Sequence, residues 1–442
     1  MKRMYRKLFA ALFIVLILAG QGFGQEKKHL TLDESIQIGL KNSKTLHASK
    51  MRVLAASAKV SEVGTARLPS LSLSASYTRL SHVPPFSVNT PFGNFDISPA
   101  IFDNYNVKLS LQQPIFTGFK LSSSHKMADY ASKAQKEEYS KDEQDLLYNI
   151  KNAYWGLFKA NKFKEAIDEN VQQVKAHLED VKNFYKQGLA TKNEVLKVEV
   201  QLSEAQLKQI DAKNSVKLAV INLDNIIGLP LSTDIDIQKD VDTQKQVTPD
   251  DLDVLVKKAM ENRPELKAMN YKVDASKSGV TLAESNWYPQ IFLAGNYYYS
   301  KPNQRILPTK NEFYGTWDVS VGLSFDLWNW GKTGDQTDQA KAQYEESKDG
   351  LASLKDALTL EVTQDYYNLI KAKEKMLVSG QSVNQAEENY RVTDDKFKQG
   401  LTLNSELLDA EVALMQAKTN YAQSIVDYEL AQAKLAKSTG DK

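Results

Sequence analysis

The sequence predicts a mainly α-helical chain with a small β part, built from long antiparallel helical hairpins and four β-strands. Three observations predict this fold. Long segments lack proline and are rich in helix-forming residues, short segments alternate apolar and polar residues, and the pattern occurs twice along 442 residues. Hydrophobic residues make up 42% and charged residues 25%, which is ordinary for a folded chain and excludes wholesale disorder.

Residues 1–24 are predicted to be an export signal peptide. Four basic residues precede the apolar run from Leu8 to Ala19, and Gly22 and Gly24 supply the small residues of a cleavage site. The rest of the chain has no apolar run long enough for a membrane-spanning helix, which leaves soluble, peripheral and β-barrel forms open. Cysteine is absent, so disulfides, thiolate metal sites and a lipidated N-terminal cysteine are excluded.

The chain contains an internal repeat. Pro69 recurs as Pro289, at an offset of 220 positions, while the motif Gln187-Gly188-Leu189 recurs as Gln399-Gly400-Leu401, at an offset of 212. We therefore expect a first repeat at residues 25–229, a linker or equatorial segment at 230–250, and a second repeat at 251–442.

The first repeat is expected to begin with a helix from Leu32 to Leu68, which Pro69 ends. A strand from Ser70 to Leu80 then places leucines and Tyr77 on one face and serines on the other, and a long loop covers Ser81 to Asn104. A second alternating strand starts at Tyr105. Gly118 marks the point where this strand passes into a helix.

Residues 120–187 contain no proline and predict one helix of roughly 100 Å. A second helix from Leu189 to Ile227 returns, so Gly188 is the tip of a helical hairpin. The second repeat shows the same order, with strands at Ile291 to Tyr299 and Trp317 to Leu327, and Gly331 at the strand-to-helix junction.

The alternating strands fit two interpretations. One is a soluble sheet with a single buried face. The other is a set of membrane strands with an apolar lipid face, a polar lumen face and aromatic residues at the membrane interfaces. Aromatic residues near the strand ends favour the membrane; these are Tyr77, Tyr105, Tyr297, Tyr299 and Trp317.

Chain geometry also predicts self-association. A rod roughly 100 Å long has too small an interior to be stable alone, and four strands cannot close a barrel. Identical chains that share one barrel solve both problems. We expect a trimer with twelve strands, because the eight strands of a dimer would leave a barrel filled by side chains.

The sequence resembles the TolC-type outer membrane factor family over nearly the whole mature chain. The resemblance lies in the opening Leu30 to Ile36 followed by Asn42-Ser43, in Arg67-Leu68-Pro69, in Gln113 to Gly118, and in the duplicated glycine-leucine tips. It implies a homotrimeric conduit in the outer membrane of a Gram-negative bacterium: a twelve-stranded barrel on a periplasmic helical tunnel. Its implied partners are an inner-membrane pump, proton-driven or ABC type, and a periplasmic membrane-fusion adaptor.

Glu406 and Asp409 lie three residues apart on one expected helix, and each would form a ring of three carboxylates in a trimer. By resemblance these rings face the periplasmic entrance and set selectivity; the alternative is a solvated helix start stabilised by the helix dipole. Glu194 is the counterpart of Glu406 in the first repeat, but it fits a capping box better. In the family an aromatic residue can precede the second tip glycine by three positions and a basic residue can follow it by two.

Phe397 fits the first of these two positions and Thr402 departs from the second, so a basic lock at the tunnel mouth is not predicted. The expected adaptor-docking residues are Gly188, Leu189, Gly400 and Leu401, because an apolar residue at an exposed tip invites a partner. The alternative, which can hold at the same time, is an ordinary helix C-cap.

No constellation for catalysis, nucleotide binding or metal binding stands out, so we expect neither an enzyme nor a cofactor. The five histidines lack metal-ligand spacing and are expected to be solvated surface residues. The balance of 56 basic and 55 acidic residues gives no sign of nucleic-acid binding. The function predicted is a passive export duct of a tripartite efflux or type I secretion system; the alternative is a secreted periplasmic coiled-coil scaffold or adhesion protein without channel activity.

Overall fold

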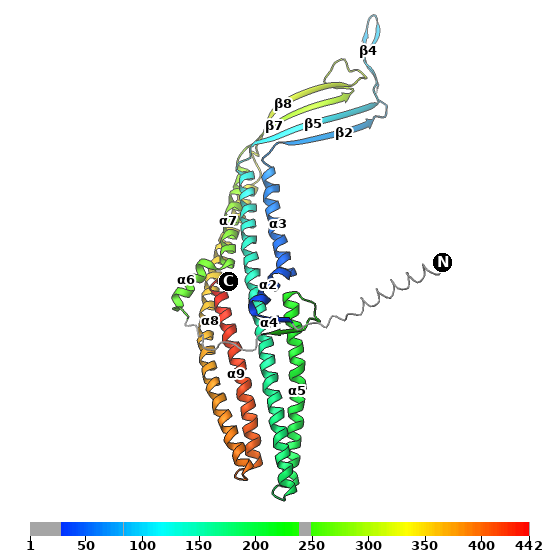
Figure 1. The fold of residues 1–442 in the computed structure, drawn as a ribbon. Coiled ribbons are helices and arrows are strands. Elements are labelled where there is room, and N and C mark those ends of the chain that lie inside the picture. The colour runs from blue at the N-terminus through cyan, green and yellow to red at the C-terminus, as the bar shows by residue number, and fades with distance from the viewer. Residues whose placement is uncertain (1–27, 83, 238–248, 442) are drawn as a thin grey trace, which may run out of the picture. The chain divides into compact units, whose positions relative to one another are not determined.

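The computed structural model describes residues 28–82, 84–237 and 249–441, so the expected signal peptide lies outside the described residues. Figure 1 shows helices of very different length and a sheet of long strands. The chain forms two compact units. The helical unit comprises residues up to 48, 140–263 and 356–442, and the sheet unit comprises 49–139 and 264–355. The long helices α4 and α8 continue from one unit into the other.

The sheet unit is built on four antiparallel strands, in the order β2-β5-β7-β8. Their bounds are Ser70–Arg79 for β2, Asp103–Phe116 for β5, Gln290–Lys301 for β7 and Tyr314–Ser324 for β8. The alternation of apolar and polar residues therefore did predict the strands. The strand expected to reach Leu327 ends at Ser324 instead.

The expected loop from Ser81 to Asn104 was wrong in one respect, because it contains a β-hairpin. Strand β3 (Phe86–Thr90) pairs with β4 (Gly93–Ser98) around a tight turn. The hydroxyl of Ser87 donates a hydrogen bond of 2.5 Å to Asp96 across the pair. The prolines at positions 84, 85, 91 and 99 flank these strands or occupy the turn, where no ladder hydrogen bond is lost.

Long helices make up most of the rest. Helix α4 (Lys120–Lys186) and α8 (Lys332–Lys398) each have 67 residues, and they are followed by α5 (Lys192–Ile227) and α9 (Asn404–Ser438). The remaining helices are α2 (Leu32–Asn42), α3 (Lys44–Thr65), α6 (Leu252–Asn262), α7 (Pro264–Glu284) and the short η1 (Ser285–Trp287). Among the described residues, no helix combines the length and hydropathy that a bilayer span requires.

The single helix expected from Leu32 to Leu68 was also wrong, because it breaks at Ser43. The backbone of Ser43 is extended, and its hydroxyl accepts the N–H of Leu46 at 3.1 Å, so it ends α2 and caps α3. The second repeat breaks at Arg263, which is extended because it precedes Pro264. Each repeat therefore contains a short amphipathic helix, α2 or α6, that ends before the longer helix α3 or α7 begins.

The helical unit has a core to which all four long helices contribute. One buried cluster joins α4, α5, α8 and α9, through Val174, Leu178, Val181, Val195, Val198, Phe397 and Leu407. A smaller one joins Ile167, Ala212 and Met415. The expected linker at 230–250 contributes β6 (Ile235–Ile237), which pairs in parallel with β1 (Lys28–Leu30), while residues 238–248 lie outside the described part.

Candidate functional site

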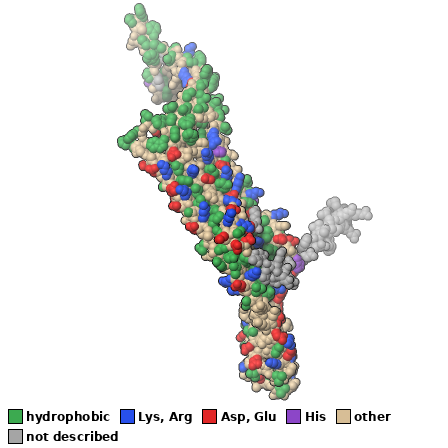
Figure 2. Space-filling model, turned by 90° about the vertical axis from the view of Figure 1, so that its left-hand side faces the viewer, with side chains coloured by type: hydrophobic (Ala, Val, Ile, Leu, Met, Phe, Trp, Pro, Cys, Tyr) green, Lys and Arg blue, Asp and Glu red, His purple; other side chains and the backbone are tan. Residues whose placement is uncertain are grey.

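The four-stranded sheet has one apolar and one polar face. The strand registers align Leu73 with Leu109, Leu109 with Tyr297, and Tyr297 with Trp317, so these side chains share a face. On the face drawn in Figure 2, hydrophobic side chains predominate over the strands, whereas charged side chains are frequent over the helices. Many of these apolar strand residues are exposed, which a soluble sheet would avoid.

The opposite face carries a hydrogen-bonded polar row. The hydroxyl of Ser110 donates to Asn296 at 2.7 Å, and the side-chain amide of Asn296 donates to Asp318 at 2.8 Å. Asp318 also pairs with Arg305 at 2.5 Å. These contacts connect β5, β7 and β8 through side chains that require water or one another, as expected for a face lining an aqueous space.

The five predicted interface aromatics all lie on the apolar face of the sheet, in the half of each strand that is nearer to the strand-connecting loops. The rings of Tyr77 and Tyr105 are 4.9 Å apart, and the register pairs Tyr297 with Trp317. Phe313 extends the group, with ring distances of 5.7 Å to Tyr105 and 5.1 Å to Tyr299. We call this group the loop-side aromatic cluster.

A second group of aromatics lies where the strands connect to the helices, and the sequence analysis did not predict this group. The rings of Phe116, Phe119 and Tyr288 contact one another at 5.8 to 6.4 Å. Trp328 and Trp330 lie between the end of β8 and the start of α8, with ring centroids 5.8 Å apart. The available signal was their position at or near the ends of the alternating strands.

The expected docking residues form two matching helix ends in the helical unit. Gly188 and Gly400 have φ of 77° and 74°, a left-handed backbone that glycine adopts without a Cβ clash. In each, the following leucine donates its N–H back into the last helical turn, from Leu189 to Phe184 and from Leu401 to Lys396, both at 2.8 Å. Both leucine side chains nevertheless remain exposed, 74% and 71%, so the caps do not bury them.

The candidate entrance residues differ in their surroundings. Glu406 and Asp409 both lie on the exposed face of the first turns of α9, and Glu406 accepts a hydrogen bond from Thr402. Leu403 provides no side-chain cap for this helix. Glu194 completes a capping box with Thr191, which confirms that interpretation. Phe397 is buried, and its ring lies 4.9 Å from the His177 imidazole and 5.5 Å from Phe184.

The expectation of solvated histidines was wrong for His177. Its side chain on α4 and that of Glu411 on α9 are each only 1% exposed, and Nδ1 lies 3.3 Å from the carboxylate. Packing between two helices places this pair inside the core, which helical spacing on α4 alone does not reveal.

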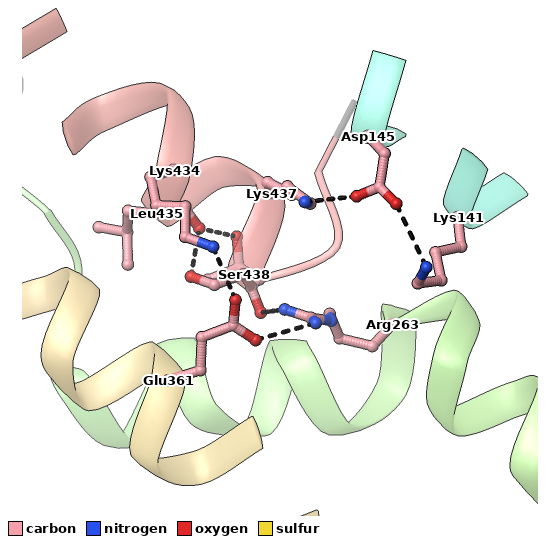
Figure 3. A network of polar contacts seen from close by, with 9 residues as sticks. Lys141, Asp145, Arg263, Glu361, Lys434, Leu435, Lys437 and Ser438 are labelled. Atoms are coloured by element: carbon pink, nitrogen blue, oxygen red, sulfur yellow. Dashed lines mark hydrogen bonds and ion pairs between the residues drawn. The ribbon is translucent and has the colours of Figure 1, made fainter. Parts of the chain in front are cut away.

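A network of charges joins further elements of the helical unit (Figure 3). The guanidinium of Arg263, after α6, lies 3.0 Å from Glu361 on α8 and donates to the carbonyl of Ser438 at 3.2 Å. Lys434 on α9 binds Glu361 from the other side at 2.9 Å. Although burial opposes its ionisation, the hydrogen bond from Lys434 and the charge of Arg263 hold the pKa of Glu361 below its ordinary value.

Comparison with known proteins identifies the family to which the chain belongs. The family model described as "Outer membrane efflux protein" matches residues 35–229 and again residues 255–441. The chain belongs to the outer membrane efflux protein family. It is 24% identical over 335 residues to the alkaline protease secretion protein AprF of Pseudomonas aeruginosa, covering 76% of this chain and 69% of that protein. It is 23% identical to the outer membrane protein TolC of Vibrio cholerae, covering 85% and 83%.

Solved structures of an outer-membrane channel and of an outer membrane protein share the fold. The outer-membrane channel OprN superposes with a TM-score of 0.78 at 16% identity, covering 93% of this chain and 90% of that chain. VceC from Vibrio cholerae also gives 0.78, at 18% identity and 93% and 96% coverage. The chain therefore has the fold of outer membrane channels and is an export protein of the Gram-negative outer membrane with a large periplasmic part.

Proposed function

We propose that this outer membrane efflux protein forms a homotrimeric, passive export duct that receives cargo from an inner-membrane pump through a periplasmic adaptor. The observation that carries the proposal is the open sheet. Strands β2 and β8 are the edges of the four-stranded order, and each has one side without a strand partner among the described residues. Exposed edges of this length and apolarity require pairing with another chain.

Strand direction supports pairing between copies. Each neighbouring pair in the sheet is antiparallel, so β2 and β8 run in opposite directions. A β2 edge placed against the β8 edge of another copy continues the antiparallel ladder without interruption. Three copies of four strands make a closed twelve-stranded barrel, which leaves no free edge.

Helix α5 supports the same assembly from the helical unit. Its buried residues Val198, Ala205 and Ala212 face the chain's own core. On the opposite side an apolar stripe is exposed at coiled-coil spacing; its members are Leu196, Val200, Leu207, Ile210, Leu218 and Ile221. A helix of a second copy would bury this stripe and complete a shared helical wall.

We also propose roles for individual residues of the chain. The exposed leucines at the Gly188 and Gly400 tips are proposed to dock the adaptor, and Glu406 and Asp409 are proposed to line the periplasmic entrance. The loop-side aromatic cluster is proposed to lie at a membrane interface. Repeats at 25–229 and 251–442 are supported by helices of matching length and order.

Engineered disulfides test the assembly directly, since the chain has no cysteine of its own. Each β2 serine at positions 70, 72, 74 and 76 is replaced by cysteine in turn, together with Ser320→Cys on β8. At least one combination should give a covalent trimer ladder on denaturing gels after oxidation of outer membranes.

The control pairs Ser110→Cys on the inner strand β5 with Ser320→Cys, and it should give no ladder because β5 already has neighbours on both sides. A chain that stays monomeric in the soluble periplasm with every β2 cysteine would contradict the duct and favour the scaffold interpretation.

A further inference from the structure

The connection between β7 and β8 folds back over the polar face of the sheet. It comprises residues 302–313, and Asn303 near its start is only 3% exposed. The side-chain amide of Asn303 donates to the carbonyl of Tyr314 at 3.1 Å and to the hydroxyl of Thr316 at 3.2 Å. Its side-chain oxygen accepts the N–H of Arg305 at 3.0 Å. The start of the connection is therefore fixed to β8 by a buried side chain.

Arg305 fastens the connection to the same face of the sheet. Its guanidinium pairs with Asp318 at 2.5 Å and lies 4.2 Å from the centroid of the Tyr298 ring. Both partners lie on the polar face, since Asp318 belongs to the polar row and Tyr298 alternates with Tyr297 of the apolar face. An ion pair that also covers an aromatic ring is a firmer contact than an exposed ion pair alone. We call residues 302–306 the exit strap.

The exit strap spans a hollow instead of packing flat on the strands. A cavity of about 340 Å³ lies between the strap and the sheet. Most of its lining side chains are polar, so the space suits water and not an apolar core. Its lining includes Asn104 and Asn106 of β5, Tyr298 and Ser300 of β7, and Asn303, Gln304 and Arg305 of the strap. The strap therefore extends into the space in front of the polar face.

The exit strap also lies at the end of the sheet that is remote from the long helices. On this side β7 ends at Lys301 and β8 begins at Tyr314, whereas the other end of β8 leads to α8. In the proposed duct the polar face lines the lumen, and this end of the sheet is the outer exit. Three copies of the chain would then place three straps around the exit.

We propose that the exit strap narrows the outer exit and that Arg305, by holding the strap on Asp318 and Tyr298, sets the width of the cargo that can leave. This inference rests on the proposed duct and adds a size limit at its exit. Pore diameter decides which molecules pass a channel, so a strap that reaches into the lumen determines specificity without binding the cargo.

The ion pair explains Arg305 better as a clamp than as a charge filter. Asp318 compensates the charge of the guanidinium, so the pair offers little net attraction to an ionic cargo. Loss of either partner should release the strap. Since Arg305→Gln removes a positive charge and Asp318→Asn removes a negative one, a clamp predicts the same effect of both changes, whereas a charge filter predicts opposite effects.

Cysteine labelling from outside the cell tests the width of the exit, because the chain has no cysteine of its own. Ser320→Cys places a thiol at an exposed position of β8, on the polar face and beyond Asp318 towards the helices. Whole cells are treated with the small N-ethylmaleimide or with a bulky polyethylene-glycol maleimide that does not cross the outer membrane.

With the strap clamped, the small reagent should label Ser320→Cys readily and the bulky reagent should label it slowly. Arg305→Gln and Asp318→Asn should each raise the rate of bulky labelling about fivefold or more, because a wider exit admits the larger probe. The side chain of Arg305 is 45% exposed, so its replacement should leave the chain folded. Labelling by the small reagent and trimers on gels verify that each variant assembles.

Two matched variants control for charge and for the loss of an ion pair. Lys108→Gln removes a cation from the polar face but no bond of the strap. Arg79→Gln breaks a comparable ion pair, with Asp103 at 2.7 Å, on the apolar face near the same end of the sheet. Neither change should alter the rate at which the bulky reagent labels Ser320→Cys.

A reference position separates failure of the strap from failure of the duct. Asn89→Cys lies on the exposed β3–β4 hairpin and should react with the bulky reagent in every variant. No reaction there would refute the duct, since the strand-connecting loops would not face the outside of the cell. If Asn89→Cys reacts but bulky labelling of Ser320→Cys is equal in all variants, or changes in opposite directions in Arg305→Gln and Asp318→Asn, the strap proposal is overturned and the duct stands.

Discussion

Single ionisable residues of the helical unit are buried where the surroundings are unfavourable for a charge. His177 and Glu411 are packed against each other between α4 and α9, with Phe397 against the imidazole. Such a pair is costly to separate, because removing one partner leaves the other buried without compensation. The pair therefore favours one specific alignment of these two helices over alternatives that shift either helix by a turn.

Asp224 on α5 shows the same conflict with no compensating charge. Its carboxylate oxygens are buried without a hydrogen-bond partner among the described residues, and burial raises its pKa to about 6. In the unfolded chain an aspartate titrates near pH 4. The folded state thus prefers the protonated form, and stability is lost as pH rises from about 4 through about 6.

We predict that Asp224→Asn stabilises the protein at pH 7.5 by about 2–3 kcal/mol and changes little at pH 4. The neutral amide removes the cost of a buried charge, which the wild-type chain avoids only at low pH. Denaturant unfolding in detergent, followed by far-UV circular dichroism, measures the difference. Asp211→Asn, an exposed carboxylate on the same helix, is the control and should leave stability unchanged at both pH values. A gain equal at both pH values would contradict the assignment.

At the scale of whole elements, the long helices end where the last backbone carbonyls can accept hydrogen bonds from the N–H groups that follow directly. The helical hairpins turn at Gly188 and Gly400, whose left-handed conformation lets the next N–H bond back into the helix. Because these caps are satisfied by backbone groups, they do not need the leucine side chains that follow. Two exposed apolar side chains at matching tips are therefore free to contact a partner.

We predict that Leu189→Gln combined with Leu401→Gln weakens adaptor binding by about thirtyfold, the effect of losing an apolar anchor of about 2 kcal/mol. The trimer should retain its thermal stability, since both side chains are exposed in the chain. Co-purification of the adaptor with tagged duct after cross-linking in cells provides the measurement. Leu54→Gln, an exposed leucine on α3, is the matched control. Undiminished co-purification by the double variant would remove the tips as docking sites.

At the scale of the whole molecule, the described residues of one chain leave apolar surface and strand edges uncovered. The open edges of the sheet and the exposed stripe of α5 belong to different units of the chain. The proposed trimer would cover both, because it adds further copies around an axis. Residues that are surface groups in one chain would then recur as rings.

We predict that Glu406→Gln with Asp409→Asn reduces block by multivalent cations by about tenfold and alters single-channel conductance in planar bilayers. Three copies would place six carboxylates at the entrance, and neutral amides would remove the attraction for cations. The same charge change on α5, Glu204→Gln with Asp211→Asn, is the control and should leave the block unchanged. Identical currents in the wild type and the entrance variant would exclude the rings.

Local patterns were sufficient for much of the fold. Alternation located the four long strands, and the proline-free segment 120–187 located α4, because these signals come from side chains close together in sequence. The break at Ser43 was missed because a serine can cap a helix or lie within one, and only its hydrogen bond to the N–H of Leu46 distinguishes them. The β3–β4 hairpin was missed because its proline-rich sequence is also typical of loops.

By itself, the sequence determined the helical and strand periods, the repeat, the tip glycines and the family. Only the tertiary structure decided that His177 faces Glu411, that Arg263 binds Glu361, and that the ring of Phe119 packs against that of Tyr288. The physical reason is distance along the chain. Periodicity and capping depend on neighbours within a few residues, whereas partners on different elements depend on how the folded backbone brings remote segments together.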